Sequence, residues 1–222
     1  MPGKLFVVAT PIGNLEDITF RAIETLKSVD MIACENIERH LKLLTHFGIK
    51  KRVFEYSPAN EEVSAKGILK QLLTGKNIAL VSDAGTPLLS DPGKRLVSLV
   101  RENNINIIPI PGPSALTTII SVCHFREKNI IFLGFLSKSE SKIRKELEKF
   151  KDIEAIFVLF SSSHQIKKIL NNINKIYGNV EIIIGREMTK ENEEFIFGNI
   201  NEVCSANFIE RGEFTVAFCN KV

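Results

Sequence analysis

The residues best suited to chemistry follow a short uncharged run at positions 78–81. Such a run is typical of a strand buried on both faces of a parallel sheet. Asp83, Gly85 and Thr86 come next and offer a carboxylate, close backbone approach and a hydroxyl. Acids without basic partners suit a cationic or hydroxyl-bearing ligand. The alternative is that Asp83 caps a turn while Asp91, followed by Pro92, caps the next helix.

Two more loops leave predicted strands and should open at the same edge of the sheet. Residues 10–17 follow a strand at 5–9, and residues 111–115 follow a strand at 105–110. Ligands of open α/β sheets bind beyond the carboxyl ends of the strands, so the three loops predict a cleft. The first loop lacks a G-x-G-x-x-G pattern and could instead be a tight turn with Asp17 as helix N-cap. The Pro-Gly-Pro of the third could be a linker.

A charged loop at residues 185–190 follows a strand of the second half, although its charges could simply form an exposed ion pair. We find no pattern for a Ser/His/Asp triad, a Cys/His pair, a phosphate-binding loop or paired metal carboxylates. The scattered Cys and His residues predict no metal site, buried reduced cysteines, and histidines at the surface or in caps. Chemistry supplied by a bound cofactor, with the protein orienting the reactants, fits these residues best.

The composition is that of an ordinary globular protein, with 222 residues, 44% of them hydrophobic and 25% charged. The apolar runs are shorter than the roughly 20 residues of a membrane helix, and the start does not resemble a signal peptide. We therefore predict a cytoplasmic protein without a membrane partner. The net charge of +3 is too small to indicate a nucleic-acid partner. Residues 138–151 are basic but interleaved with Glu, which favours a solvated helix with i,i+4 ion pairs; a phosphate-binding patch is the alternative.

The order of elements predicts an α/β fold with two α/β domains, at residues 1–118 and 119–222. Strands and helices alternate through residue 110, which predicts a first domain with a mainly parallel five-stranded sheet. In the second domain, the segments at 194–197 and 213–219 lie close in sequence and alternate in polarity, which suggests antiparallel pairing and a mixed sheet.

Several ordered motifs show a family resemblance that runs from about residue 4 to the end. The chain resembles the ribosomal RNA small-subunit methyltransferase I family of the tetrapyrrole methylase superfamily at residues 8–19, 46–49, 80–93, 111–115, 134–136, 186–190 and 212–214. This resemblance implies S-adenosyl-L-methionine bound in a cleft between the two domains, and a homodimer. It also implies methyl transfer to the ribose 2′-hydroxyl of a cytidine in small-subunit (16S) ribosomal RNA, either free or in the assembled subunit.

The resemblance also implies roles for individual residues. The expected cofactor contacts from the first domain are Ile12, Asp83, Ala84, Gly85, Thr86, Leu89, Ser114 and Ala115. Phe160 and Arg186 should join them from the second domain. Around the acceptor hydroxyl, the catalytic candidates are Asn14, Glu16, Glu187 and Lys190.

Three departures from the family pattern keep alternative functions open. The chain has Asn36 within a usual Glu-Asp-Thr-Arg, Ala59 for a usual His, and a Ser-rich segment at 161–163 that ends in Gln165 where Arg is usual. Loss of that arginine predicts weaker RNA affinity unless residues 138–151 compensate. A tetrapyrrole-type methylase, or a cofactor-binding, ribosome-associated protein that has lost catalysis, are the alternatives.

Overall fold

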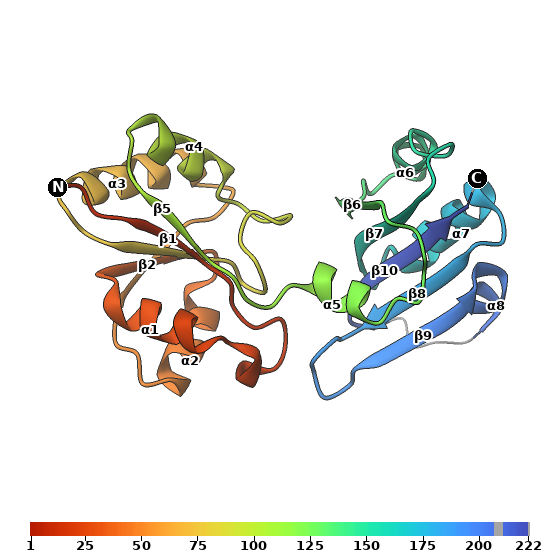
Figure 1. Cartoon of the computed structure of the whole chain (residues 1–222), viewed down its shortest axis with the longest axis horizontal. Helices are drawn as coiled ribbons and strands as arrows, with labels where there is room; N and C mark the ends of the chain where they lie inside the picture. Colours follow the sequence, from red (N-terminus) through yellow and green to blue (C-terminus); the bar gives the residue numbers. More distant parts are fainter. Residues whose placement is uncertain (207–210, 222) are drawn as a thin grey trace. The chain divides into compact units, whose positions relative to one another are not determined.

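A computed structural model describes residues 1–206 and 211–221. The chain forms two compact units, Met1–Ser114 and Ala115–Val222, which are described separately. Each unit contains one sheet with helices, which confirms the prediction of two α/β domains (Figure 1). The domain limits predicted at residue 118 stay a prediction.

The first unit is built on a five-stranded parallel sheet, as predicted. Its strands lie in the order β3-β2-β4-β1-β5, and all four neighbouring pairs are parallel. The strands are β1 (Leu5–Val8), β2 (Met31–Cys34), β3 (Arg52–Glu55), β4 (Ile78–Val81) and β5 (Ile107–Ile110). All four residues of β2 and of β4 are buried, as expected for strands covered on both faces.

Helices cover both faces of this sheet (Figure 1). One face packs against α1 (Phe20–Ser28) and α2 (Ile37–His46), with Leu26 and Leu44 in the core. The other packs against α3 (Glu61–Leu73) and α4 (Lys94–Glu102). A short 3-10 helix, η1 (Leu15–Asp17), lies in the loop between β1 and α1. Because helices cover both faces of the sheet, the loops at the carboxyl ends of β1, β4 and β5 remain at its edge, where they can form a site.

Two helix caps predicted from local sequence are wrong. Asp17 does not cap α1, because the Thr19 hydroxyl accepts the hydrogen bond from the Ala22 N–H at 3.1 Å. Asp91 does not cap α4, since the N-cap residue is Gly93 and the helix begins at Lys94. In each case the helix begins later in the chain than the acid that local cap preference singles out.

The second unit contains the mixed sheet that was predicted. Its order is β6-β7-β10-β8-β9, with β6 and β7 parallel and the other three pairs antiparallel. The elements are α5 (Ala115–Ser121), β6 (Ile130–Phe135), α6 (Glu140–Glu148), β7 (Ala155–Ser162), α7 (Ile166–Tyr177), β8 (Glu181–Arg186), β9 (Glu194–Asn199), α8 (Ile200–Ser205) and β10 (Glu213–Asn220). β9 and β10 do not pair with each other as their closeness suggested. Instead the almost wholly buried β10 lies between β7 and β8.

One apolar layer of the second unit lies between its sheet and helices α6, α7 and α8. Phe157 and Phe218 from the sheet, with ring centroids 5.0 Å apart, pack in one cluster with Leu147 of α6 and Ile173 of α7. The helix α5 contacts β8 and β10, and its Ile119 is fully buried. None of the helices among the described residues is long and apolar enough to cross a membrane.

Candidate functional site

The three loops predicted to form a site meet at the carboxyl edge of the first sheet. Thr10 and Gly85 exchange two backbone hydrogen bonds of 2.9 Å, which tie the loop after β1 to the loop after β4. The Thr86 hydroxyl donates to the Pro113 carbonyl at 3.1 Å, which ties the loop after β4 to the loop after β5. Six residues predicted as cofactor contacts, from Asp83 to Ser114, lie on these joined loops.

Gly85 is the point of closest approach among the three loops. Its φ of +78° belongs to the left-handed region, where a side chain is disfavoured. A Cβ there would lie 3.2 Å from Ile12 Cγ2 and 3.6 Å from the Pro113 carbonyl oxygen. A side chain at residue 85 would therefore strain the backbone and crowd Ile12. Ile12 and Gly85, both predicted cofactor contacts, thus lie next to each other.

A buried histidine supports the loop after β4. His40 is 2% exposed, with Nδ1 2.9 Å from the Asn36 carbonyl oxygen and Nε2 3.1 Å from the Ser82 carbonyl oxygen. The Asp83 carboxylate lies 3.6 Å from His40 Nδ1 and accepts a 3.0 Å hydrogen bond from the Asn36 N–H. The prediction that His40 lies at the surface or in a cap is wrong. Its helical spacing with the apolar Leu43 and Leu44 was the available signal.

Two further acids lie near Asp83, and sequence reasoning missed both as site residues. Burial raises the pKa of Asp91 to about 6; the neighbouring charge of Glu35 adds to this, and a hydrogen bond with Ser82 opposes it. Burial also raises the pKa of Glu35, with a further contribution from Asp83. A carboxyl group with a pKa near 6 could exchange a proton at neutral pH. This edge of the sheet therefore combines anionic charge with a titratable acid.

The predicted charged loop after β8 forms a connected ion-pair network in the second unit. The Lys190 Nζ donates to Glu187 Oε1 at 3.0 Å and to Glu213 Oε2 at 2.8 Å. The Glu213 N–H donates to Glu187 Oε1 at 2.7 Å. The side chains of Glu187 and Lys190 are each roughly one-quarter exposed, so they do not form the simple exposed ion pair that the sequence left as the alternative. Glu187 and Thr189 also have positive φ, of 49° and 66°, which marks a constrained turn.

The network settles the ionic state of its two catalytic candidates. Burial by itself raises the pKa of Glu187, but the Glu213 N–H, Lys190 and Arg186 together bring it below its ordinary value. Burial likewise lowers the pKa of Lys190, but its bonds to Glu213 and Glu187 outweigh this and raise it. Glu187 is therefore a carboxylate and Lys190 an ammonium at neutral pH.

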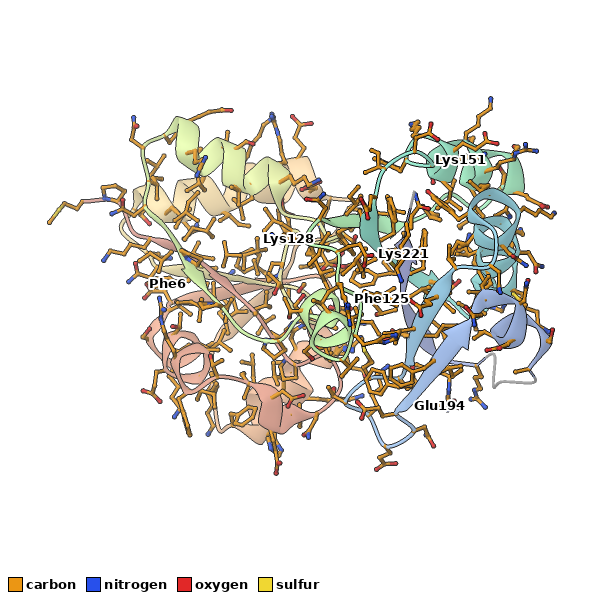
Figure 2. All side chains as sticks on the ribbon, turned by 45° about the vertical axis from the view of Figure 1, so that its right-hand side comes forward. Phe6, Phe125, Lys128, Lys151, Glu194 and Lys221 are labelled. Carbon is orange, nitrogen blue, oxygen red and sulfur yellow. The ribbon has the colours of Figure 1, made fainter. Side chains whose placement is uncertain are left out.

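The remaining predicted residues lie at separate places. Arg186 is 7% exposed and donates from Nε to Glu194 Oε2 at 2.8 Å and from Nη1 to the Arg211 carbonyl at 3.2 Å (Glu194 is labelled in Figure 2). Phe160, on β7, packs edge-to-face against Phe132 and Phe135.

The last four predicted residues lie at η1, in the loop after β4 and at the start of α5. The Asn14 side chain caps η1 through the Glu16 N–H at 3.0 Å, and Glu16 itself is exposed. Leu89 is half-buried in the loop after β4, and Ala115 begins α5. Within residues 1–206 and 211–221, no group of three His, Cys, Asp or Glu side chains could hold a metal ion.

Comparison with known proteins places this arrangement in a family. Residues 4–204 match the sequence model of the Tetrapyrrole (Corrin/Porphyrin) Methylases. The chain is 43% identical over 213 residues to "Ribosomal RNA small subunit methyltransferase I" of Leptospira biflexa, covering 96% of this chain and 89% of that protein. It is 41% identical to the protein of the same name from Thermotoga maritima, covering 99% of both. The chain belongs to the ribosomal RNA small subunit methyltransferase I family.

Solved structures support the family fold at much lower identity. A diphthine synthase superposes with a TM-score of 0.72 at 16% identity, covering 99% of this chain and 91% of that one. A uroporphyrin-III-C-methyltransferase from Thermus thermophilus gives a TM-score of 0.71 at 13% identity, covering 98% and 94%. These likenesses establish the two-domain tetrapyrrole methylase fold in this member of the family.

Proposed function

We propose that this protein transfers a methyl group from S-adenosyl-L-methionine to the ribose 2′-hydroxyl of a cytidine in small-subunit ribosomal RNA. The observation that carries the proposal is the similarity of 41–43% over nearly the whole chain to proteins named for methylation of that RNA. We further propose that it acts in the cytoplasm as a homodimer, on the free RNA or the assembled subunit.

The first sheet has features that fit the methyl donor. The Gly85 junction holds the loops after β1, β4 and β5 close together, so residues of all three loops can contact one ligand. The acids Asp83, Glu35 and Asp91 give the edge a negative character that suits a sulfonium, an ammonium or ribose hydroxyls. The residues that would hold the donor are Ile12, Asp83, Ala84, Gly85, Thr86, Leu89, Ser114 and Ala115, with Phe160 and Arg186 from the second unit. When bound, S-adenosyl-L-methionine supplies an electrophilic methyl group.

The protein's part in the reaction is to align the ribose oxygen and assist the loss of its proton. We propose Asn14, Glu16, Glu187 and Lys190 as the groups around the acceptor. Glu187, an ionised carboxylate, can accept a hydrogen bond from the ribose hydroxyl, although two donors already hold its Oε1. Lys190, an ammonium, can stabilise negative charge that develops on the ribose oxygen. Alignment then contributes most of the rate.

A transfer assay tests this function directly. The protein is incubated with labelled S-adenosyl-L-methionine and, in separate reactions, with small subunits from a methylation-deficient strain or with a tetrapyrrole, and the label is mapped. Label on a cytidine ribose is the expected result. Label that appears only on a tetrapyrrole, or cofactor binding without transfer to either substrate, would overturn the proposal. Glu187→Gln should lower turnover at saturating cofactor; an unchanged rate would remove Glu187 from the acceptor site.

A further inference from the structure

Charge is segregated along the second unit. Residues 137–180, which include α6, β7 and α7, hold nine Lys or Arg against five Asp or Glu. Residues 181–222 hold four Lys or Arg against eight Asp or Glu. The small net charge of the whole chain therefore conceals a basic half and an acidic half of one unit. The basic half contains two of the three helices that cover one face of the sheet.

Three lysines of α6 and its C-cap, called here the α6 lysines, share one exposed face. Lys142, Lys145 and Lys149 follow each other at spacings of three and four residues, which places their Cβ atoms about 5–6 Å apart along the helix. All three are exposed. Ile143 and Leu147 lie on the opposite side of α6 and are fully buried in the core. The core therefore fixes which side of the helix faces solvent, and that side carries ammonium groups.

The acids of α6 do not neutralise these lysines. Glu146 has the spacing to pair with Lys142 and Lys149, but its carboxylate instead accepts from the Ser137 N–H at 3.1 Å and the Ser137 hydroxyl at 2.5 Å. In the described part of the chain, no ion pair involves Lys142, Lys145 or Lys149. The i,i+4 ion pairs expected from the sequence of this helix therefore form only in part.

The other two acids of the helix are engaged with different cations. Glu148 pairs with Arg144 at 2.6 Å, and Glu140 pairs with Lys175 of α7 at 3.4 Å. The second contact joins α6 to α7. A groove between these helices is lined by both pairs and by Lys151, which follows α6 and is labelled in Figure 2. Each of these pairs neutralises its own cation, so the lysines without an ion pair in the described structure lie on the exposed face of α6 and not in the groove.

We propose that the exposed lysine face of α6 binds the phosphate backbone of the RNA substrate. This inference rests on the proposed function, which supplies the RNA. Lysines whose Cβ atoms lie about 5–6 Å apart suit successive phosphates of a nucleic-acid strand, because a flexible lysine can reach a phosphate without fixed geometry. Each ammonium group that contacts a phosphate releases counterions condensed on the RNA, which favours binding at low salt. Such a surface binds RNA without sequence preference and leaves selection of the cytidine to other residues.

The test is a triple substitution, Lys142→Ala, Lys145→Ala and Lys149→Ala, in the full chain. Filter binding to small-subunit ribosomal RNA is measured from 0.05 to 0.5 M salt. Each phosphate contact contributes about 0.7–0.9 to the slope of log affinity against log salt, so the slope should fall by about 2 to 3. Because that contribution vanishes near 1 M salt, affinity at 0.1 M salt should fall roughly 100- to 500-fold.

Two control variants separate this surface from charge in general. The first is a triple variant that removes the same charge from exposed positions on or just after α3, and it should keep the wild-type slope. Its substitutions are Lys66→Ala, Lys70→Ala and Lys76→Ala. Replacing the three α6 lysines by Arg keeps the charge and should also bind as the wild type does. Titration with S-adenosyl-L-methionine should give the wild-type affinity for every variant, which shows that the fold is intact.

The outcomes distinguish this inference from the proposed function. If the wild type methylates the RNA while the triple Ala variant keeps its salt slope, the docking surface is wrong although the function stands. The lysines would then be a solvated helix face without a role in RNA binding. If the wild type neither binds nor methylates the RNA, both proposals fail. A raised KM for RNA with unchanged kcat supports docking as the role of these lysines.

Discussion

Substituting Ala for Gly85 tests whether the junction of the three loops controls cofactor binding. The new Cβ would sit at a φ of +78°, and it would lie 3.2 Å from Ile12 Cγ2. Ile12 is 7% exposed, so its side chain has little room to move away. The substitution therefore imposes two separate costs at one position, a backbone cost and a packing cost.

Both costs can be given a magnitude. A Cβ in the left-handed region costs roughly 1–2 kcal/mol, and mild overpacking of a nearly buried site adds about 1 kcal/mol or more. We expect Gly85→Ala to lower the free energy of unfolding of the first unit by about 3 kcal/mol, or roughly 100-fold in the equilibrium constant. The distorted junction should also weaken S-adenosyl-L-methionine binding more than tenfold.

Two other glycines of the same unit serve as matched controls. Gly48 has a φ of +65°, but no described atom lies within 4 Å of a Cβ placed there, so Gly48→Ala should cost only the backbone term of about 1–2 kcal/mol. Gly67 lies inside α3 with similarly open space among the described residues, and its φ is not in the left-handed region. Gly67→Ala should therefore stabilise the unit by about 0.5–1 kcal/mol.

Urea denaturation followed by circular dichroism measures the stabilities. In a Tyr177→Phe background Tyr56 is the remaining tyrosine of the sequence, and its fluorescence then reports on the first unit because it is buried there. Isothermal titration measures cofactor affinity under conditions where every variant is folded. The reasoning is refuted if Gly85→Ala is no less stable than Gly48→Ala. It is equally refuted if Gly85→Ala binds S-adenosyl-L-methionine as the wild type does.

Two further substitutions test the titratable acid and the ion-pair network. Because burial raises the folded pKa of Asp91 from 3.8 to about 6, the wild type loses stability as pH rises through that interval. Asp91→Asn should therefore stabilise the protein by about 1 kcal/mol at pH 8, after allowance for solvent screening, and should leave its stability unchanged below pH 4. Thermal unfolding at a series of pH values measures the stability difference between the two proteins. A difference that does not change with pH would contradict this reasoning. In the second unit, a Cβ at Gly212 would lie 2.8 Å from Glu187 Cγ at a φ of +121°. Gly212→Ala should displace Glu187, lower stability by about 2–3 kcal/mol and slow methyl transfer. Gly178→Ala, with open space around it in the described structure, should cost about 1–3 kcal/mol, because its φ of 75° and ψ of −156° lie in a region that glycine alone adopts readily, but it should keep the rate. Equal rates in the two variants would show that displacement of Glu187 has no consequence.

Local sequence determined the elements and their order, because the signals involved are themselves local. The uncharged run at 78–81 and the alternation of strands with helices predicted a parallel sheet, and the structure confirms it. Since parallel strands end at one edge, the three loops after β1, β4 and β5 could be expected to meet. The backbone hydrogen bonds between Thr10 and Gly85 show that the loops after β1 and β4 do meet.

Contacts between distant residues decided what local patterns could not. Asp91 resembles a helix cap, but burial beside Glu35 makes it a titratable acid instead. Glu146 has the spacing of a helix ion pair, but Ser137 takes its carboxylate. Spacing along a helix specifies which partners are within reach, whereas the competition among donors for one carboxylate is settled only when other segments pack beside it. The sequence by itself thus determined the family, the sheet and the loops of the site. The tertiary structure decided the partners and ionic states of the side chains on them, because these depend on burial and on charges far away in the chain.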